Sequence, residues 1–222
     1  GCYGNALVQT PNLDRLAAQG TRYDAAFASC PVCSPARSAM MTGMYQTSIG
    51  VHNHRSHRDD NYRLPEPVKV ITSYFRDAGY FVTNGRGTDW ERGGKTDWNF
   101  TPDEKPFDGT DWRQRKAGQP FLAQYNFSLT HRDFKRDPER PIDPAKVDLP
   151  PYYPDTPLLR RDWADYLESL QVLDTQHRDV TSQFLTDKDG HVTLARPLVP
   201  AMYTTDKAVI AQDCLCYFME RI

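Results

Sequence analysis

Apolar residues recur at the spacing of one helical face in three stretches of the chain: residues 11–19, 68–78 and 157–176. The first stretch has clear boundaries, since Thr10 is a favoured N-cap, Pro11 suits the first helical position and Gly20 can end the helix. Thr156 caps the last stretch in the same way. We therefore expect three helices. The apolar stripe of the last one consists of Trp163, Tyr166, Leu167, Leu170 and Leu173.

Three further segments have the composition of strands: Thr21–Phe27, Tyr80–Thr83 and Gln119–Phe127. The third is too apolar to have one solvated face. A strand buried on both faces is typical of a parallel sheet covered by helices. The order helix, Gly79, strand fits the same architecture. The pattern thus predicts an α/β fold.

Composition and charge exclude several classes of protein. The 222 residues are 39% hydrophobic and 25% charged, as in a globular domain with a sizeable core. A net charge of −2 offers no electrostatic basis for nucleic-acid binding. No apolar run reaches the roughly 20 residues that a membrane helix requires. Five cysteines, an odd number, argue against a disulfide scaffold.

The segment from Cys33 to Arg37 carries the strongest chemical signal. Ser34 is a good N-cap, Pro35 suits the first helical position, and Gly43 can end a helix that continues to Thr42. Cys33 would then lie just outside a helix N-terminus, where unpaired N–H groups and a partial positive charge favour an anion. Arg37 follows one turn later and can return its guanidinium to the same place. A thiol, a helix dipole and an arginine would thus surround an oxyanion.

Two other interpretations of Cys33 stay open. Free cysteines are often buried structural residues. Cys30 and Cys33 also have Cys-x-x-Cys spacing, which suits a redox pair or half of a zinc site. Cys214 and Cys216 could supply the other half, although their one-residue spacing departs from the usual zinc pattern.

Cys33-Ser34-Pro35-Ala36-Arg37 resembles the Cys-x-Pro-x-Arg motif of type I, formylglycine-dependent sulfatases. Gly1–Asn5 and Thr10–Ala17 resemble the segment before the sulfatase cysteine, and Met41–Tyr45 resembles the segment after it. The likeness is therefore continuous from residue 1 to about residue 50. Overall it is closest in kind to bacterial members related to heparan N-sulfatase and the arylsulfatases.

This resemblance implies an alkaline-phosphatase-like fold, a mixed and mainly parallel sheet flanked by helices, here incomplete. It also implies that Cys33 is converted to formylglycine by a formylglycine-generating enzyme or a radical maturase. The hydrate of that aldehyde attacks the sulfur of a sulfate ester and then expels the sulfate. Arg37 would orient this group and offset developing charge.

Other positions take roles from matching blocks of the family. Gly94-Lys95-Thr96-Asp97-Trp98-Asn99-Phe100 matches the Lys-Thr-Asp-Tyr-Asn-Phe segment of bacterial sulfatases, so Lys95 is expected to contact the sulfate. An upstream Gly87-Thr88-Asp89-Trp90 resembles a local duplication. Gln119-Pro120-Phe121 and Thr130-His131 match the strand whose histidine contacts the sulfate, which makes His131 the candidate leaving-group acid. Apart from these blocks, His52, His54 and His57 form a cluster that suits a metal loop, a solvated basic loop or a loop near the mouth of the pocket. We favour the last, with His54 as the candidate substrate-binding residue.

The family binds a divalent cation, usually Ca²⁺, or Mg²⁺, with formylglycine as one ligand. Cys33 is thus also a candidate metal-site position. The paired aspartates that precede this block in the family, and a later Ser-Asp-His-Gly segment, are not found between residues 1 and 222. The resemblance assigns residues 1–176 to the N-terminal part of a sulfatase catalytic domain truncated at both ends. It leaves residues 177–222 as an unassigned tail, and the chain alone is expected to be inactive or very weak.

The resemblance implies a sulfuric ester hydrolase that cleaves sulfate esters or sulfamates of sugars, with aryl sulfates as another substrate class. It implies a periplasmic or extracellular location, although these residues include no signal peptide. One alternative is a sulfatase-like domain that binds sulfated glycans without cleaving them. The other is the Cys-x-x-Cys zinc or redox module.

Overall fold

The computed structural model describes residues 1–57, 59–185 and 216–220, which fall into two compact units. Residues 27–126 and 216–220 form the first, here called the sheet unit. Residues 1–26 and 127–185 form the second, the helical unit.

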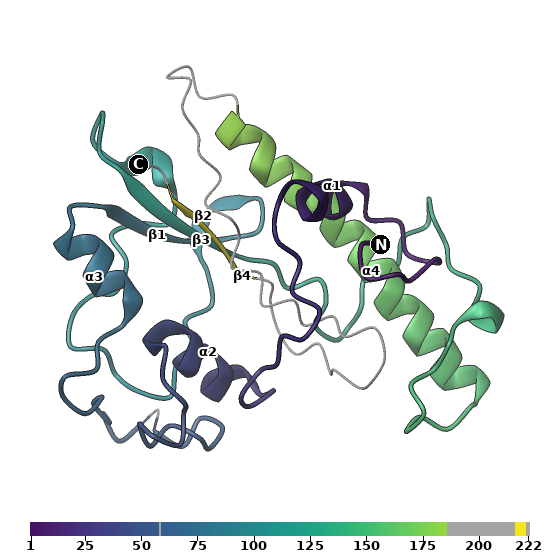
Figure 1. Ribbon diagram of the computed structural model, residues 1–222, viewed down its shortest axis with the longest axis horizontal. Coiled ribbons are helices and arrows are strands. Elements are labelled where there is room, and N and C mark those ends of the chain that lie inside the picture. The colour runs from purple at the N-terminus through teal and green to yellow at the C-terminus, as the bar shows by residue number, and fades with distance from the viewer. Residues whose placement is uncertain (58, 186–215, 221–222) are drawn as a thin grey trace. The chain divides into compact units, whose positions relative to one another are not determined.

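A four-stranded sheet is the frame of the sheet unit (Figure 1). Its strand order is β2 (Asp89–Gly93), β1 (Phe81–Arg86), β3 (Phe121–Asn126) and β4 (Cys216–Glu220). The central pair β1–β3 is parallel, with Phe81 opposite Phe121 and Arg86 opposite Asn126, while both outer pairs are antiparallel. The carboxyl ends of β1 and β3 therefore meet at one edge, where open α/β sheets place their ligands.

The strand predictions are confirmed at the centre of the sheet and wrong elsewhere. Every residue of β3 is buried, as its composition required, and β1 lies one residue beyond the expected start. No strand forms over Thr21–Phe27. β2 was not predicted: the first Thr-Asp-Trp copy forms the turn and outer strand of a hairpin with β1. β4 lies in the unassigned tail.

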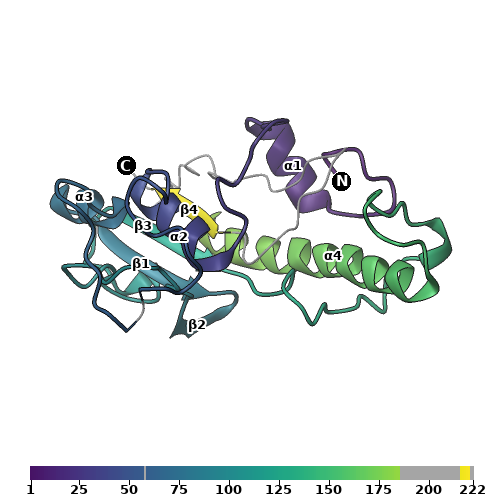
Figure 2. The same ribbon diagram turned by 90° about the horizontal axis from the view of Figure 1, so that it is seen from below.

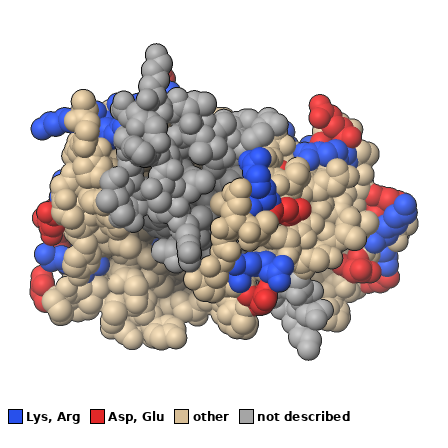
Figure 3. All heavy atoms as spheres, turned by 45° about the horizontal axis from the view of Figure 1, so that its top comes forward, with Lys and Arg blue, Asp and Glu red and all other residues tan. Residues whose placement is uncertain are grey.

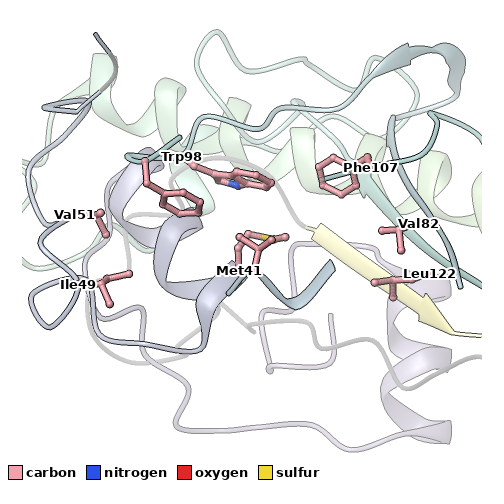
Figure 4. Packing of buried hydrophobic residues seen from close by; sticks show 9 residues of the cluster. Met41, Ile49, Val51, Val82, Trp98, Phe107 and Leu122 are labelled. Carbon is pink, nitrogen blue, oxygen red and sulfur yellow. The ribbon is translucent and has the colours of Figure 1, made fainter. Parts of the chain in front are cut away.

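Helices α2 (Cys33–Thr42) and α3 (Ile71–Asp77) and the 3₁₀ turn η1 (Trp112–Gln114) complete the sheet unit. α3 begins three residues later than the pattern predicted, and Gly79 follows it with φ +89°. Met41 of α2 is fully buried and points toward Val82 and Leu122 of the sheet (Figure 4). Trp98 and Phe107 close the same core.

The helical unit contains α1 (Pro11–Gln19), α4 (Pro157–Leu185) and the 3₁₀ turn η2 (Pro144–Lys146), with α1 beside α4 in both views (Figures 1 and 2). Thr10, Pro11 and Gly20 bound α1 as predicted. The Asp174 carboxylate of α4 accepts the N–H of Leu13 at 2.8 Å, which satisfies the positive end of α1. The predicted stripe of α4 is confirmed, and the helix runs nine residues past Gln176.

Charged side chains of both signs lie next to one another on the face in Figure 3 and do not gather into a patch of one sign. Arg161, for example, pairs with Asp165 and with Glu168. Within the described residues, no helix has the length and apolarity needed to cross a bilayer.

Candidate active site

Cys33 is the first residue of α2, because the helix starts earlier than the sequence suggested. Val32, in an extended conformation, takes the N-cap position, and Ser34 and Pro35 lie inside the first turn. The Ser34 hydroxyl is fully buried and accepts the N–H of Arg55 at 2.9 Å, so it serves tertiary structure in place of capping. Gly43 ends the helix in the left-handed region, as predicted.

Arg37 is 4% exposed and reaches the carboxyl end of β3. Its Nη1 donates to Asn126 Oδ1 at 3.0 Å and to the carbonyl of Lys95 at 3.4 Å. Asn126 Nδ2 in turn donates to Asn84 Oδ1 of β1 at 2.6 Å. One buried cation is therefore fixed by groups from both central strands and from the Lys95 segment.

Gly94 places Lys95 against this network. Its N–H donates to the Asn84 carbonyl at 2.9 Å, and its own carbonyl accepts from Asn84 Nδ2 at 3.0 Å. A Cβ at Gly94 would lie 2.5 Å from the carbonyl of Gly85 and closer still to the amides of Asn84 and Asn126. The backbone approach therefore requires glycine here.

A buried carboxylate joins two cations beside Cys33. Asp97, whose side chain is 2% exposed, accepts from Arg55 Nε at 3.1 Å and from Arg55 Nη2 at 3.0 Å. Lys95 Nζ lies 3.4 Å from the same carboxylate. The hydrogen bonds to Asp97 raise the pKa of Arg55. One buried carboxylate thus contacts two cationic side chains.

The loop that carries His54 and Arg55 is fixed by Asn99. Asn99 Nδ2 donates to the carbonyls of Val51 and Asn53 and to Ser56 Oγ, and its Oδ1 accepts the N–H of His57 at 3.0 Å. The backbone N–H of Asn99 donates to Ser38 Oγ of α2 at 2.9 Å. The Asn99 side chain thus holds the loop of residues 51–57, and its backbone N–H ties that loop to the helix that begins at Cys33.

His54 is exposed, and one ligand atom from each of Cys33, His54 and Asp97 lies within 4.8 Å of the others. Among the described residues that contact one another here, Arg37, Arg55 and Lys95 are cationic and Asp97 is anionic. The local balance favours an anion over a cation.

The structure places the five predicted site residues in two groups. Cys33, Arg37, His54 and Lys95 all belong to the sheet unit and gather as described, whereas His131 belongs to the helical unit. His131 Nδ1 contacts the carbonyl of Arg132. Cys214 lies outside the described residues, and nothing is described of the Cys216 side chain in β4.

Sequence reasoning missed several residues of the site: Arg55, Asn84, Asp97, Asn99 and Asn126. Asn84 lies on β1, and Asn126 ends β3 at the edge where ligands cluster, so their strand positions were the available signal. Asp97 and Arg55 lie inside segments quoted for other residues, and nothing local marked them as a pair.

A cavity of about 430 Å³ shares Asp97 with this cluster, but neither Cys33 nor Arg37 lines it. Trp98, Phe100 and Phe107 form much of its wall. Such a lining suits an apolar group, so we place the anion chemistry at Cys33 and not in this cavity.

Known proteins resemble this chain. The sulfatase family model matches residues 1–191. An ulvan-active sulfatase of Formosa agariphila is 28% identical in an alignment 232 positions long. That alignment covers 83% of this chain and 38% of that protein. The N-acetylgalactosamine-6-sulfatase of Sus scrofa is 33% identical over 87 residues, 36% of this chain and 17% of that one. Human steryl-sulfatase is 47% identical over 51 residues, 23% and 9% of the two chains.

Among solved structures, a crystal structure of Ps i-CgsB in complex with k-i-k-neocarrahexaose covers 83% of this chain and 38% of its own, with 18% identity and a TM-score of 0.37. The chain thus spans less than two fifths of the length of these relatives.

Proposed function

The chain belongs to the sulfatase family, and from that membership we propose that its Cys33 site is the nucleophile-bearing centre of a sulfate ester hydrolase. The sheet and its helices are part of an alkaline-phosphatase-like α/β fold. The observation that supports the proposal most is the gathering of Arg37, Lys95 and Arg55 around Cys33 at the first turn of α2. Hydrogen-bond donors and positive charges of this kind are what bind a sulfate group.

In this proposal Cys33 is the precursor of formylglycine, made by a formylglycine-generating enzyme or a radical maturase. Its hydrate supplies a nucleophilic hydroxyl and a second hydroxyl that later expels the sulfate. Cys33 is half-buried at the start of a helix, so part of the residue is accessible to a substrate in the folded chain.

Arg37 is proposed to orient this group and to offset the charge that develops on the sulfate oxygens. Two oxygen acceptors hold the buried guanidinium, so it needs no rearrangement during the reaction. Lys95, whose side chain is 30% exposed, is proposed to contact the sulfate directly.

His131 is proposed as the acid that protonates the departing alcohol, and His54 as a substrate-binding residue at the exposed rim. An imidazole can transfer a proton near neutral pH, which the alcohol requires. The role of His131 requires its ring to reach the ester oxygen beside Cys33. Replacing it with Gln should then slow cleavage of esters with poor leaving groups more than of aryl sulfates.

The substrate is proposed to be a sulfated carbohydrate, because relatives over the longest matches are named for ulvan and for N-acetylgalactosamine 6-sulfate. A steryl-sulfatase also matches over a shorter segment, so aryl and steryl esters are the competing class. A periplasmic or extracellular location is proposed on the same family basis.

The family implies a divalent cation, but the donors that surround Cys33 here do not fit calcium or magnesium. Ca²⁺ takes six to eight oxygen ligands, and Mg²⁺ also requires oxygen. Even after Cys33 is converted to an aldehyde hydrate, the described cluster adds only an imidazole and one carboxylate, and that carboxylate is already paired with Arg55 and Lys95. The proposed steps therefore use protein side chains only.

A zinc module is the second candidate function, favoured by the cluster of Cys33, His54 and Asp97. Against it stand three neighbouring positive charges, which oppose a dication. Stoichiometric zinc bound by the chain and lost on Cys33→Ser would favour this candidate. Sulfate binding by a chain whose Cys33 stays a thiol after expression with a formylglycine-generating enzyme would favour a non-catalytic domain that binds sulfated glycans.

The decisive experiment is mass spectrometry of the Cys33 peptide after expression with a formylglycine-generating enzyme. We expect a mass decrease at Cys33 and reaction of the new aldehyde with a hydrazide, while Cys2 and Cys30 stay thiols and serve as internal controls. A fully unmodified Cys33 would overturn the enzymatic proposal. Hydrolysis of p-nitrophenyl sulfate is expected to be very weak for the chain alone and absent in Cys33→Ala.

A further inference from the structure

Arg55 occupies a special position beside Cys33. Its N–H donates to the buried Ser34 hydroxyl at 2.9 Å, which fixes its backbone against the first turn of α2. The residue has φ 56°, a left-handed conformation that costs energy for a side chain other than glycine. This conformation is held from outside by the Asn99 hydrogen bonds to Asn53 and Ser56 on either side.

The contact with Asp97 orients the guanidinium of Arg55 but uses only some of its hydrogen-bond donors. Asp97 accepts two of the five N–H donors of Arg55 in a bidentate pair. The Arg55 side chain remains 41% exposed, whereas the carboxylate beneath it is 2% exposed. A buried acceptor therefore holds one edge of the guanidinium and leaves other donors for a ligand.

The charge balance around Asp97 points to an anionic ligand. Among the described contacts, Arg55 and Lys95 both lie against the single carboxylate of Asp97. Cys33 is close enough to contribute to the raised pKa of Arg55. The exposed part of the Arg55 guanidinium thus lies near the position of the nucleophile.

We propose that Arg55 is a further sulfate-binding residue, whose guanidinium donates to an oxygen of the sulfate group held at Cys33, with Asp97 as the residue that positions it. This inference rests on the proposed function of the site. Arg55 could instead serve only to neutralise Asp97. The two roles predict opposite sulfate affinities for the double variant Arg55→Gln with Asp97→Asn.

The experiment measures binding of inorganic sulfate to the unmodified 222-residue chain. Sodium sulfate is titrated at constant ionic strength with chloride, and the Arg55 side-chain Nε–H and the Cys33 amide are followed by NMR. The variants are Arg55→Gln, Asp97→Asn and the pair combined. Arg63→Gln is the matched control, since it removes the same charge from an exposed arginine that pairs with Asp103.

We expect Arg55→Gln to weaken sulfate binding by about tenfold, the effect of one hydrogen bond between charged groups, and Arg63→Gln to leave it unchanged. Arg55→Gln with Asp97→Asn should bind as weakly as, or more weakly than, Arg55→Gln alone. If Arg55 only neutralises Asp97, the double variant regains wild-type affinity, and that result would overturn the inference.

Thermal unfolding of each variant separates loss of fold from loss of binding. Should Arg55→Gln fail to fold, Arg55→Lys takes its place, because lysine keeps the charge but cannot make the bidentate pair and should still bind more weakly. Equal affinity of wild type and Arg55→Gln, or no sulfate binding by the wild type, refutes the inference. The formylglycine measurement at Cys33 then decides the proposed function independently.

Discussion

Replacing Asn99 with Ala should destabilise the sheet unit. The effect should exceed that of replacing any single polar side chain in the loop of residues 51–57, which Asn99 holds. Asn99 is fully buried, and its side chain makes four hydrogen bonds, to Val51, Asn53, Ser56 and His57. The bond to Val51 is fully buried, so its loss leaves an unsatisfied carbonyl at a cost of about 1–3 kcal/mol. Water can reach the other three, which contribute about 0.5–1 kcal/mol each.

These terms predict a loss of about 2.5–6 kcal/mol in the free energy of unfolding. Ser56→Ala is the graded control, because it removes one partly buried bond of the same set and should cost less than about 1 kcal/mol. Urea unfolding followed by tryptophan fluorescence gives both values. Hydrogen exchange of residues 51–57 shows whether the loss is local to the loop, since two compact units need not unfold in one step.

The same variant should also weaken sulfate binding, because Arg55 would lose its fixed backbone. A loss of stability no larger than that of Ser56→Ala would refute the reasoning. It would mean that water replaces the Asn99 amide without cost and that other contacts hold the loop.

Three further predictions use other parts of the structure. Met41→Ala should cost about 2–5 kcal/mol in urea unfolding, because Met41 is fully buried in the core of the sheet unit, whereas Met41→Leu should cost less than about 1.5 kcal/mol. Gly94→Ala should lower the melting temperature and weaken sulfate binding, since its Cβ meets backbone and amide atoms; Gly93→Ala, whose Cβ has its nearest neighbour at 3.9 Å, should change neither. The hydrogen bond to Asp60 raises the pKa of His57, so the pair stabilises the fold fully below about pH 6.5 and loses that stabilisation as pH rises through the raised value. The melting temperature of wild type relative to His57→Gln should therefore be higher at pH 5.5 than at pH 8.5, and an unchanged difference would contradict this.

Local signals made most helices and the central strands predictable. Thr10, Pro11 and Gly20 mark the ends of α1, although the Thr10 side chain makes no capping hydrogen bond and Asp174 of α4 accepts from the first turn in its place. The apolar composition of β3 identified a strand buried on both faces. The Cys33 motif and its flanks identified the family, and the family model confirms that resemblance.

Errors occurred where distant residues override a local preference. Ser34 has the side chain of an N-cap, but its hydroxyl accepts from Arg55, so Val32 takes the cap and the helix includes Cys33. Thr21–Phe27 has strand-like composition, but a strand requires a partner and none of the described strands pairs with it. Pairing is decided by the sheet and not by the segment.

The sequence by itself determined most of the helices, the two central strands, the Cys33 motif and the family, because each rests on residues that are close together along the chain. Only the tertiary structure decided which charges meet. Arg55 pairs with Asp97 across 42 positions, and Arg37 reaches Asn126 across 89. These contacts exist because the parallel register of β1 and β3 brings their carboxyl ends to one edge and the packing of α2 places Cys33 there. The strand positions of Asn84 and Asn126 indicate that edge, but the sequence does not show which distant charges meet there.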